Sequence, residues 1–343
     1  MATAAGAELR VDVHSIEPIP EADKDSTGPQ QMWIWAGANI APINWALGAL
    51  GIVLKLGLWE TIAVIVLGNL VGCGIFAAFT VMGHKTGVNQ MVLQRSAFGR
   101  RGAYLPSALM FLMTLGWIGV NTYFPVKIAV AILGATVASV TKDTDPAKMV
   151  SAVFGGITSV LVLLMVLHGP IATNILNIYS AALAALSTGV RLSRMALGLI
   201  AGVVGYLVTI YFVFQPSFAK AFDNWMISLL LWMSPWAGVI LADFFIKRKG
   251  HIDVGALYQT PERSAYGDIN WGAIAAFLVG LIAGWTVEDG LVPALQGPIS
   301  TSLLSGADLS WLVGIVVAGA VYLAIGTRVV AAAVPRPMGD ARR

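Results

Sequence analysis

The chain has 343 residues, of which 57% are hydrophobic and only 11% are charged, and its 21 lysines and arginines against 18 acidic residues give a net charge of +3. Soluble domains carry about 25% charged residues, so a water-soluble fold of this size would expose large apolar patches. The same hydrophobic content excludes a disordered chain, and so small a basic excess indicates no nucleic-acid partner. We therefore expect an all-α polytopic membrane protein whose first partner is the lipid bilayer.

Residues 1–31 are polar and mostly acidic, without the hydrophobic segment of a cleavable signal. We expect a disordered tail there and a second tail at 334–343, with a transmembrane domain over 32–333. The single cysteine, Cys73, lies in an apolar run, so no internal disulfide can form. The four histidines are far apart and share no metal-ligand spacing.

Apolar runs of about 17–25 residues are long enough to cross a hydrocarbon core of roughly 30 Å as helices. Nine such runs predict about nine transmembrane helices, and a Gly169-Pro170 pair separates the fourth run from the fifth. The runs are 33–54, 61–83, 104–133, 150–168, 171–190, 195–215, 225–246, 271–287 and 310–333.

The cationic loops give conflicting orientations for nine crossings. Short loops rich in Lys and Arg prefer the cytoplasmic side, so the cluster Lys85–Arg101 after the second run places the N-terminus inside. The clusters after the fifth, seventh and ninth runs would then lie outside. Either one run between about residues 134 and 190 fails to cross, or the chain lacks an odd number of ancestral spans.

The first run contains Gly37 and Pro42 five residues apart, with Asn39 between them. Proline removes a backbone donor and clashes with the preceding turn, so the pattern indicates an interrupted helix. Secondary transporters use the freed carbonyls of such helices for ion and substrate sites. An ordinary proline kink is the alternative.

Polar residues recur at helical spacing in two further runs. In the third run, Trp117 and Asn121 are i, i+4 neighbours, and an aromatic ring beside an amide suits a planar heterocycle. In the fifth run, Thr173, Asn177 and Ser180 form a polar stripe, with Asn174 one step round the helix. The alternative in both runs is packing and hydrogen bonding between helices.

No spacing typical of a catalytic nucleophile, a zinc protease, a redox cysteine pair or a phosphate loop occurs in the chain. Glu60, Asp243 and Glu288 lie at the edges of the predicted spans, where interfacial or loop-capping carboxylates are expected. We therefore expect neither enzyme activity nor a cofactor.

Several motifs resemble those of a known family. The first stretch reads Gly83-His-Lys-Thr-Gly87, Arg95-Ser-Ala-Phe98-Gly99-Arg-Arg-Gly102, Leu105-Pro106 and Gly116-Trp117. The second reads Pro235-Trp-Ala-Gly238, Ala242-Asp243, Tyr258, Tyr266-Gly267 and Asn270-Trp271. Together with Asn177-Ile-Tyr179-Ser180, they resemble the purine–cytosine permease branch of the first nucleobase–cation symporter family, from Trp33 onward.

The resemblance implies a shortened relative of a twelve-span, five-plus-five inverted-repeat fold similar to the leucine-transporter fold. Residues 32–168 would correspond to spans one to four and residues 171–333 to spans eight to twelve. Spans five to seven, which in the family contribute to the inner gate and the substrate pocket, would be missing at Gly169-Pro170. Three is an odd number, which agrees with the charge conflict.

The resemblance further implies secondary transport of nucleobases of the cytosine and purine type across the plasma membrane, coupled to a gradient of sodium or protons. Matching positions predict substrate contacts at Asn39, Trp117, Asn121, Asn174 and Asn177. They predict cation ligands at Gly37, Ile40, Gly169 and Thr173, while Ala172 supplies no hydroxyl where the family has one. The alternative is a degenerate, transport-incompetent remnant or a membrane interaction partner, and homo-oligomerisation stays open.

Overall fold

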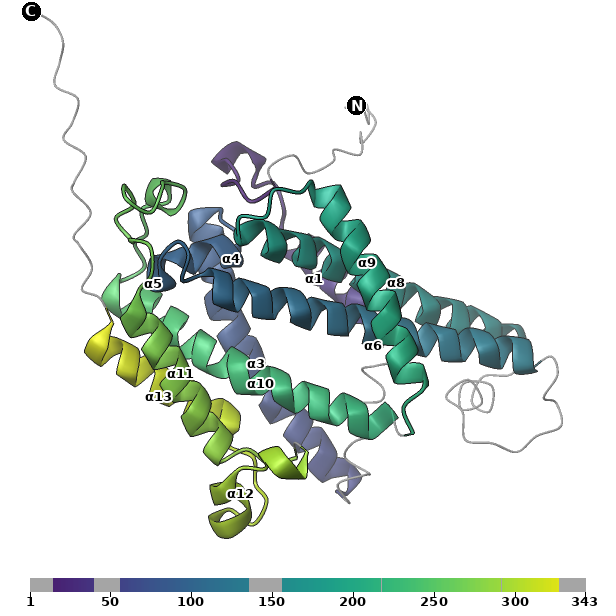
Figure 1. Ribbon diagram of the computed structural model, residues 1–343. Coiled ribbons are helices and arrows are strands. Elements are labelled where there is room, and N and C mark those ends of the chain that lie inside the picture. The colour runs from purple at the N-terminus through teal and green to yellow at the C-terminus, as the bar shows by residue number, and fades with distance from the viewer. Residues whose placement is uncertain (1–14, 40–55, 136–155, 217, 291, 327–343) are drawn as a thin grey trace, which may run out of the picture.

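The computed structural model describes residues 15–39, 56–135, 156–216, 218–290 and 292–326, and this part of the chain is all-helical (Figure 1). The longer helices are α1 (Gly28–Asn39), α3 (Leu58–Thr86), α6 (Tyr104–Ala135), α8 (Gly156–Ser187), α9 (Arg194–Val213), α10 (Phe218–Leu241), α11 (Trp271–Thr286) and α13 (Ser310–Ile325). The short helices are α4 (Gln90–Leu93), α5 (Arg95–Phe98) and α12 (Pro298–Leu303), and a π-helical turn, Ala242–Lys247, continues α10.

Five helices of the described part are long and apolar enough to cross a membrane, and α11 and α13 are shorter apolar helices. These helices make the chain an integral membrane protein that crosses the bilayer several times.

Local sequence sets several helix boundaries. Asn270 caps α11 by accepting from the backbone N–H of Ala273, and Ser193 caps α9 in the same way. Gly87 ends α3 in the left-handed conformation that glycine adopts without a steric penalty.

The predicted fourth and fifth runs form one helix, which corrects the expectation of nine crossings. Helix α8 continues from Gly156 through Pro170 to Ser187, and at 1.5 Å per residue its 32 residues extend about 48 Å. One continuous helix of that length crosses a bilayer once. Proline is tolerated inside a membrane helix where neighbouring groups satisfy the freed backbone, so the Gly169-Pro170 pair does not end a span here.

With α8 as a single element, the cationic loops come together at one end of the molecule. Arg95 of α5 donates to the backbone carbonyls of Ser187 (3.1 Å), which ends α8, and of Leu257 (3.1 Å), in the α10–α11 connection. Arg100 donates to Gln259 in the same connection at 2.8 Å. We call the loops 87–103, 188–193 and 248–270 the cationic end. The conflict between the charge clusters disappears for the part of the chain described.

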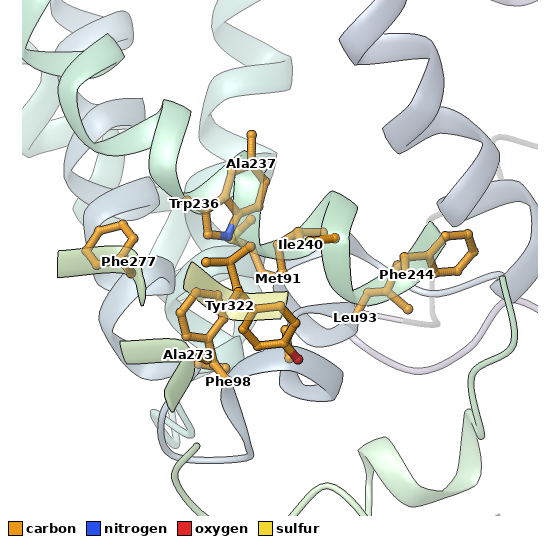
Figure 2. Close-up of a cluster of buried hydrophobic side chains, with 14 of the residues drawn as sticks. Met91, Leu93, Phe98, Trp236, Ala237, Ile240, Phe244, Ala273, Phe277 and Tyr322 are labelled. Carbon is orange, nitrogen blue, oxygen red and sulfur yellow. The ribbon is translucent and has the colours of Figure 1, made fainter. Parts of the chain in front are cut away.

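The largest hydrophobic core lies next to the cationic end (Figure 2). Met91, Leu93 and Phe98, from the segment between α3 and α6, are buried there against α10, α11 and α13. The labelled partners are Trp236, Ala237, Ile240, Phe244, Ala273, Phe277 and Tyr322. The first part of the Arg95–Gly102 motif is therefore an internal packing element, while Arg101 is exposed.

A buried carboxylate ties this segment to α10 and α13. The side chain of Asp243, which is 1% exposed, accepts from Ser96 Oγ at 2.8 Å, Arg248 Nε at 2.7 Å and Tyr322 Oη at 2.7 Å. Arg248 also donates to the carbonyl of Ser96 at 2.6 Å. Lys247 instead donates to the carbonyl of Tyr322 at 2.9 Å. Asp243 is thus not an ordinary interfacial residue, because its charge is fully paired inside the fold.

The described part of the N-terminal tail differs from the expected disordered segment. Tyr258 Oη donates to the carbonyl of Ile16 at 2.6 Å, and the backbone N–H of Ile19 donates to the carbonyl of Gly87 at 2.8 Å. Helix α1 then begins at Gly28, inside the predicted tail. The segment 16–24 therefore lies across the cationic end.

Candidate substrate and cation site

Helices α6 and α8 lie side by side (Figure 1), and Asn174 of α8 contacts α6. Asn174 Nδ2 donates to Thr122 Oγ1 at 2.9 Å, and Thr122 donates in turn to the carbonyl of Ile118 at 2.7 Å. Asn177 Nδ2 lies 3.4 Å from Asn174 Oδ1, so it adds a weaker hydrogen bond along α8. Ser180, the last member of the predicted stripe, is exposed. The interhelical hydrogen bonding that sequence alone left open is therefore present at Asn174.

Asn121 carries a buried acceptor with no partner. Its side chain is 2% exposed, and its Nδ2 donates to the carbonyl of Trp117 at 2.9 Å. Its Oδ1 accepts no hydrogen bond within the described part of the chain. Leaving a buried polar atom unpaired costs about 1–3 kcal/mol. A donor supplied from outside the chain, from a ligand or from water, would remove that cost.

Trp117 is half-buried, and one side of its ring is occupied by a second tryptophan. Trp225 of α10 lies edge-on to it, with ring centroids 4.9 Å apart and an interplanar angle of 77°. Gly116 permits this approach, because a Cβ atom there would lie 2.5 Å from the indole of Trp225. Packing therefore accounts for part of the Trp117 surface.

The predicted cation ligands of α8 meet the C-terminal end of α1. Thr173 Oγ1 lies 2.6 Å from the carbonyl oxygen of Ala38 and 2.9 Å from that of Gly169. The hydroxyl has one hydrogen, so it can donate to only one of these carbonyls at a time. Three oxygens from two helices thus gather at one point, which is the ligand type that hard cations prefer. The half-buried Ala172 adds no oxygen.

Other predicted residues lie apart from this arrangement. Asn39 is exposed at the end of α1, where its Nδ2 donates to the carbonyl of Trp35 at 2.9 Å. Gly37 lies inside α1, one residue before the carbonyl that meets Thr173. Ile40 and Pro42 fall outside the described residues. Among those described, no three His, Cys, Asp or Glu side chains are grouped to hold a metal ion.

Three participants were missed by the sequence analysis. Thr122 accepts from Asn174, the carbonyl of Ala38 meets Thr173, and Trp225 packs on Trp117. Thr122 follows Asn121 directly in the sequence, so a search of the polar residues next to Asn121 could have found it. A backbone carbonyl leaves no sequence signal, and Trp225 is too far along the chain for its contact with Trp117 to be inferred.

Comparison with known proteins gives one family. A sequence model described as "Permease for cytosine/purines, uracil, thiamine, allantoin" matches residues 18–129 and 124–314. The two matched segments therefore meet within α6, and together they cover most of the chain.

Among curated relatives, the putative purine-cytosine permease YxlA of Bacillus subtilis is 20% identical over 447 aligned positions, covering 92% of this chain and 95% of the relative. That alignment is longer than the chain, so it must contain gaps in the chain. The purine-cytosine permease FCY21 of Saccharomyces cerevisiae is 36% identical over 34% of the chain and 22% of the relative. The hydantoin permease of Microbacterium maritypicum is 28% identical over 58% of the chain and 40% of the relative. The chain thus matches less than half the length of the last two relatives.

Proposed function

This chain belongs to the family of permeases for cytosine and purines, uracil, thiamine and allantoin, and we propose that it carries nucleobases of the cytosine and purine type across the plasma membrane. The observation that carries the proposal is the unpaired, buried Oδ1 of Asn121, one helical turn from Trp117. A ring N–H of the base donates to this oxygen while the base stacks on the free surface of Trp117.

Asn174 and Asn177 form the α8 side of the proposed site. Asn174 uses its amide N–H to hold Thr122, so its oxygen is the group that remains for the base once Asn177 turns away. Asn121 and Asn174 therefore present two acceptors from facing helices. Such a pair selects a planar ring that carries N–H donors on separate edges.

We propose that transport is coupled to a cation held by the carbonyls of Ala38 and Gly169 and the hydroxyl of Thr173. To ligate a cation, the hydroxyl must turn its hydrogen away from both carbonyls and present a lone pair. The ion would then replace a hydrogen bond as the link between α1 and α8. Only three oxygens are described here, a thin shell for a dehydrated sodium ion, so protons are the second candidate.

The topology supports a shortened permease with a cytoplasmic cationic end. The elements α1, α3, α6, α8, α9, α10, α11 and α13 alternate in direction, which places every described cationic loop on one side. The family match splits within α6 and α8 is continuous through Gly169-Pro170, which favours a loss of spans at the split and not at Gly169-Pro170. Loss of an even number of spans would keep the two halves in the same orientation.

One observation favours the second candidate, a remnant that binds without transporting. Helix α3 has a 29-residue apolar sequence, yet none of its most apolar 18-residue window is buried inside the molecule. Its open face includes a groove lined by Gly68, Asn69 and Gly72. In a complete permease of twelve spans, further helices would be available to cover this face.

Uptake of radiolabelled cytosine and hypoxanthine in a permease-null host tests transport directly. We expect uptake above the empty vector for the wild type, with loss in Asn121→Ala. Asn69→Ala is the matched control, because its amide hydrogen-bonds only to Ile65 within its own helix among described residues. Base binding by the purified protein without uptake would establish the remnant. If the protein shows neither uptake nor binding, both candidates are overturned.

A further inference from the structure

The ends of α9 and α10 that point away from the cationic end enclose a cavity of about 510 Å³. The chain turns between these helices at Gln215 and Pro216, and α6 closes the inner side at Gly116. Small-molecule sites have volumes of roughly 300–1,000 Å³. The cavity is therefore large enough for a nucleobase, and it lies toward the end of the molecule opposite the cationic loops.

The lining combines the aromatic residues Tyr211, Phe212 and Trp225 with two amides. Asn224 and Gln215 provide the amides. Asn224 is half-buried, and its side chain forms no hydrogen bond with any other described residue. Gln215 makes a single long hydrogen bond, 3.4 Å from its Nε2 to the carbonyl of Tyr211. Both amides are thus available to a ligand, and each can donate and accept.

The cavity lies next to the proposed substrate site. The indole of Trp225 forms a wall of the cavity and also lies edge-on to Trp117, where Gly116 fixes its approach. Asn121 lies one turn further along α6. The same indole ring therefore borders both the cavity and the proposed substrate site.

We propose that this cavity is an outer binding site for planar nitrogen heterocycles, distinct from the site at Trp117 and Asn121. The inference rests on the proposed function, because it assigns the same substrate class to both sites. The base stacks on Trp225, and Asn224 and Gln215 hydrogen-bond to its edge. A lipid chain is the competing occupant, since Val208, Phe212 and Ala221 also line the cavity. Hydrocarbon would leave the Asn224 amide without a partner and Gln215 with only its long hydrogen bond to Tyr211, which is unfavourable.

Substrate protection of an introduced cysteine tests the outer site. The background is Cys73→Ser with Trp117→Ala, which removes the native thiol and the proposed inner platform. Asn224→Cys and, separately, Gln215→Cys are labelled with a membrane-impermeant maleimide, with and without millimolar cytosine or hypoxanthine. We expect the base to slow labelling at both positions several-fold, and Trp225→Ala to abolish that protection. Retention of a monodisperse detergent complex verifies folding of each variant.

Leu303→Cys is the matched control, because this residue of α12 is 80% exposed at the same end of the molecule. Its labelling rate should not respond to the base. If labelling at 224 and 215 is unaffected in this background while the Trp117-containing protein takes up base, the outer site does not exist and the proposed function stands. Equal slowing at 303 also overturns the inference. If the Trp117-containing protein neither binds nor takes up base, both the inference and the proposed function fail.

Discussion

Replacing Arg248 by alanine should destabilise the fold far more than replacing an arginine in an exposed ion pair. Arg248 is the charged partner of Asp243, and the two side chains are 9% and 1% exposed. Its removal leaves a buried carboxylate with only the hydroxyl donors of Ser96 and Tyr322. Loss of one partner of a buried ion pair costs about 3–5 kcal/mol. The same substitution also removes the hydrogen bond that Arg248 donates to the carbonyl of Ser96.

Arg101→Ala provides the comparison. Arg101 pairs with Asp268 at 3.2 Å, with side-chain exposures of 58% and 37%, and such surface pairs contribute about 0–1 kcal/mol. Tyr322→Phe should fall between the two arginine variants, at about 1.5–3 kcal/mol for one hydrogen bond to a charged acceptor. The assay is the free energy of unfolding in mild detergent, followed by helical circular dichroism during denaturant titration. If Arg248→Ala and Arg101→Ala agree within experimental error, the reasoning about the buried network is wrong.

Three further outcomes are expected. Ala172→Thr adds a hydroxyl beside the proposed cation ligands. Replacing choline chloride by sodium chloride should therefore raise uptake or thermal stability more in this variant than in wild type. An identical sodium response in the two proteins would show that the site does not exist. Cysteines at Arg101 and Lys249 should react with an impermeant reagent from the same side of the membrane, and labelling from opposite sides would contradict the single crossing of α8. Burial raises the pKa of Tyr258 to about 12, from its ordinary value near 10, so its hydrogen bond to Ile16 stabilises the fold fully below about pH 10 and is lost as the pH rises through 12. The difference in thermal stability between wild type and Tyr258→Phe should therefore be constant up to about pH 10 and fall between about pH 10 and 12. A difference that stays constant over that upper range would show that this pKa is not raised.

The sequence predicted the helical membrane class and one side of the candidate site. Trp117 and Asn121 are four residues apart, and the structure places both in α6, joined by a hydrogen bond from side chain to backbone. Helical periodicity suffices for such neighbours because their geometry is local. The same reasoning placed the polar stripe on α8, although it could not show that Asn174 beside the stripe contacts α6.

The failures have physical causes. Gly169-Pro170 was interpreted as a break because proline usually ends soluble helices, whereas α8 continues through it inside the packed bundle. Asp243 was interpreted as interfacial because no sequence pattern links it to its partners. These come from α5, α13 and the segment after α10. The buried segment around Phe98 resembled a cationic loop, and only the structure shows its apolar side chains packed in the core.

The most direct test of the central claim is equilibrium binding of radiolabelled cytosine and hypoxanthine to the purified protein in detergent. The account predicts saturable binding of one or both bases. Trp117→Ala should weaken it by about 5- to 150-fold, because stacking of a base on an aromatic side chain contributes roughly 1–3 kcal/mol. Asn69→Ala should bind like the wild type. Absence of saturable binding at millimolar base, or undiminished binding by Trp117→Ala and Asn121→Ala alike, would contradict a nucleobase site between α6 and α8.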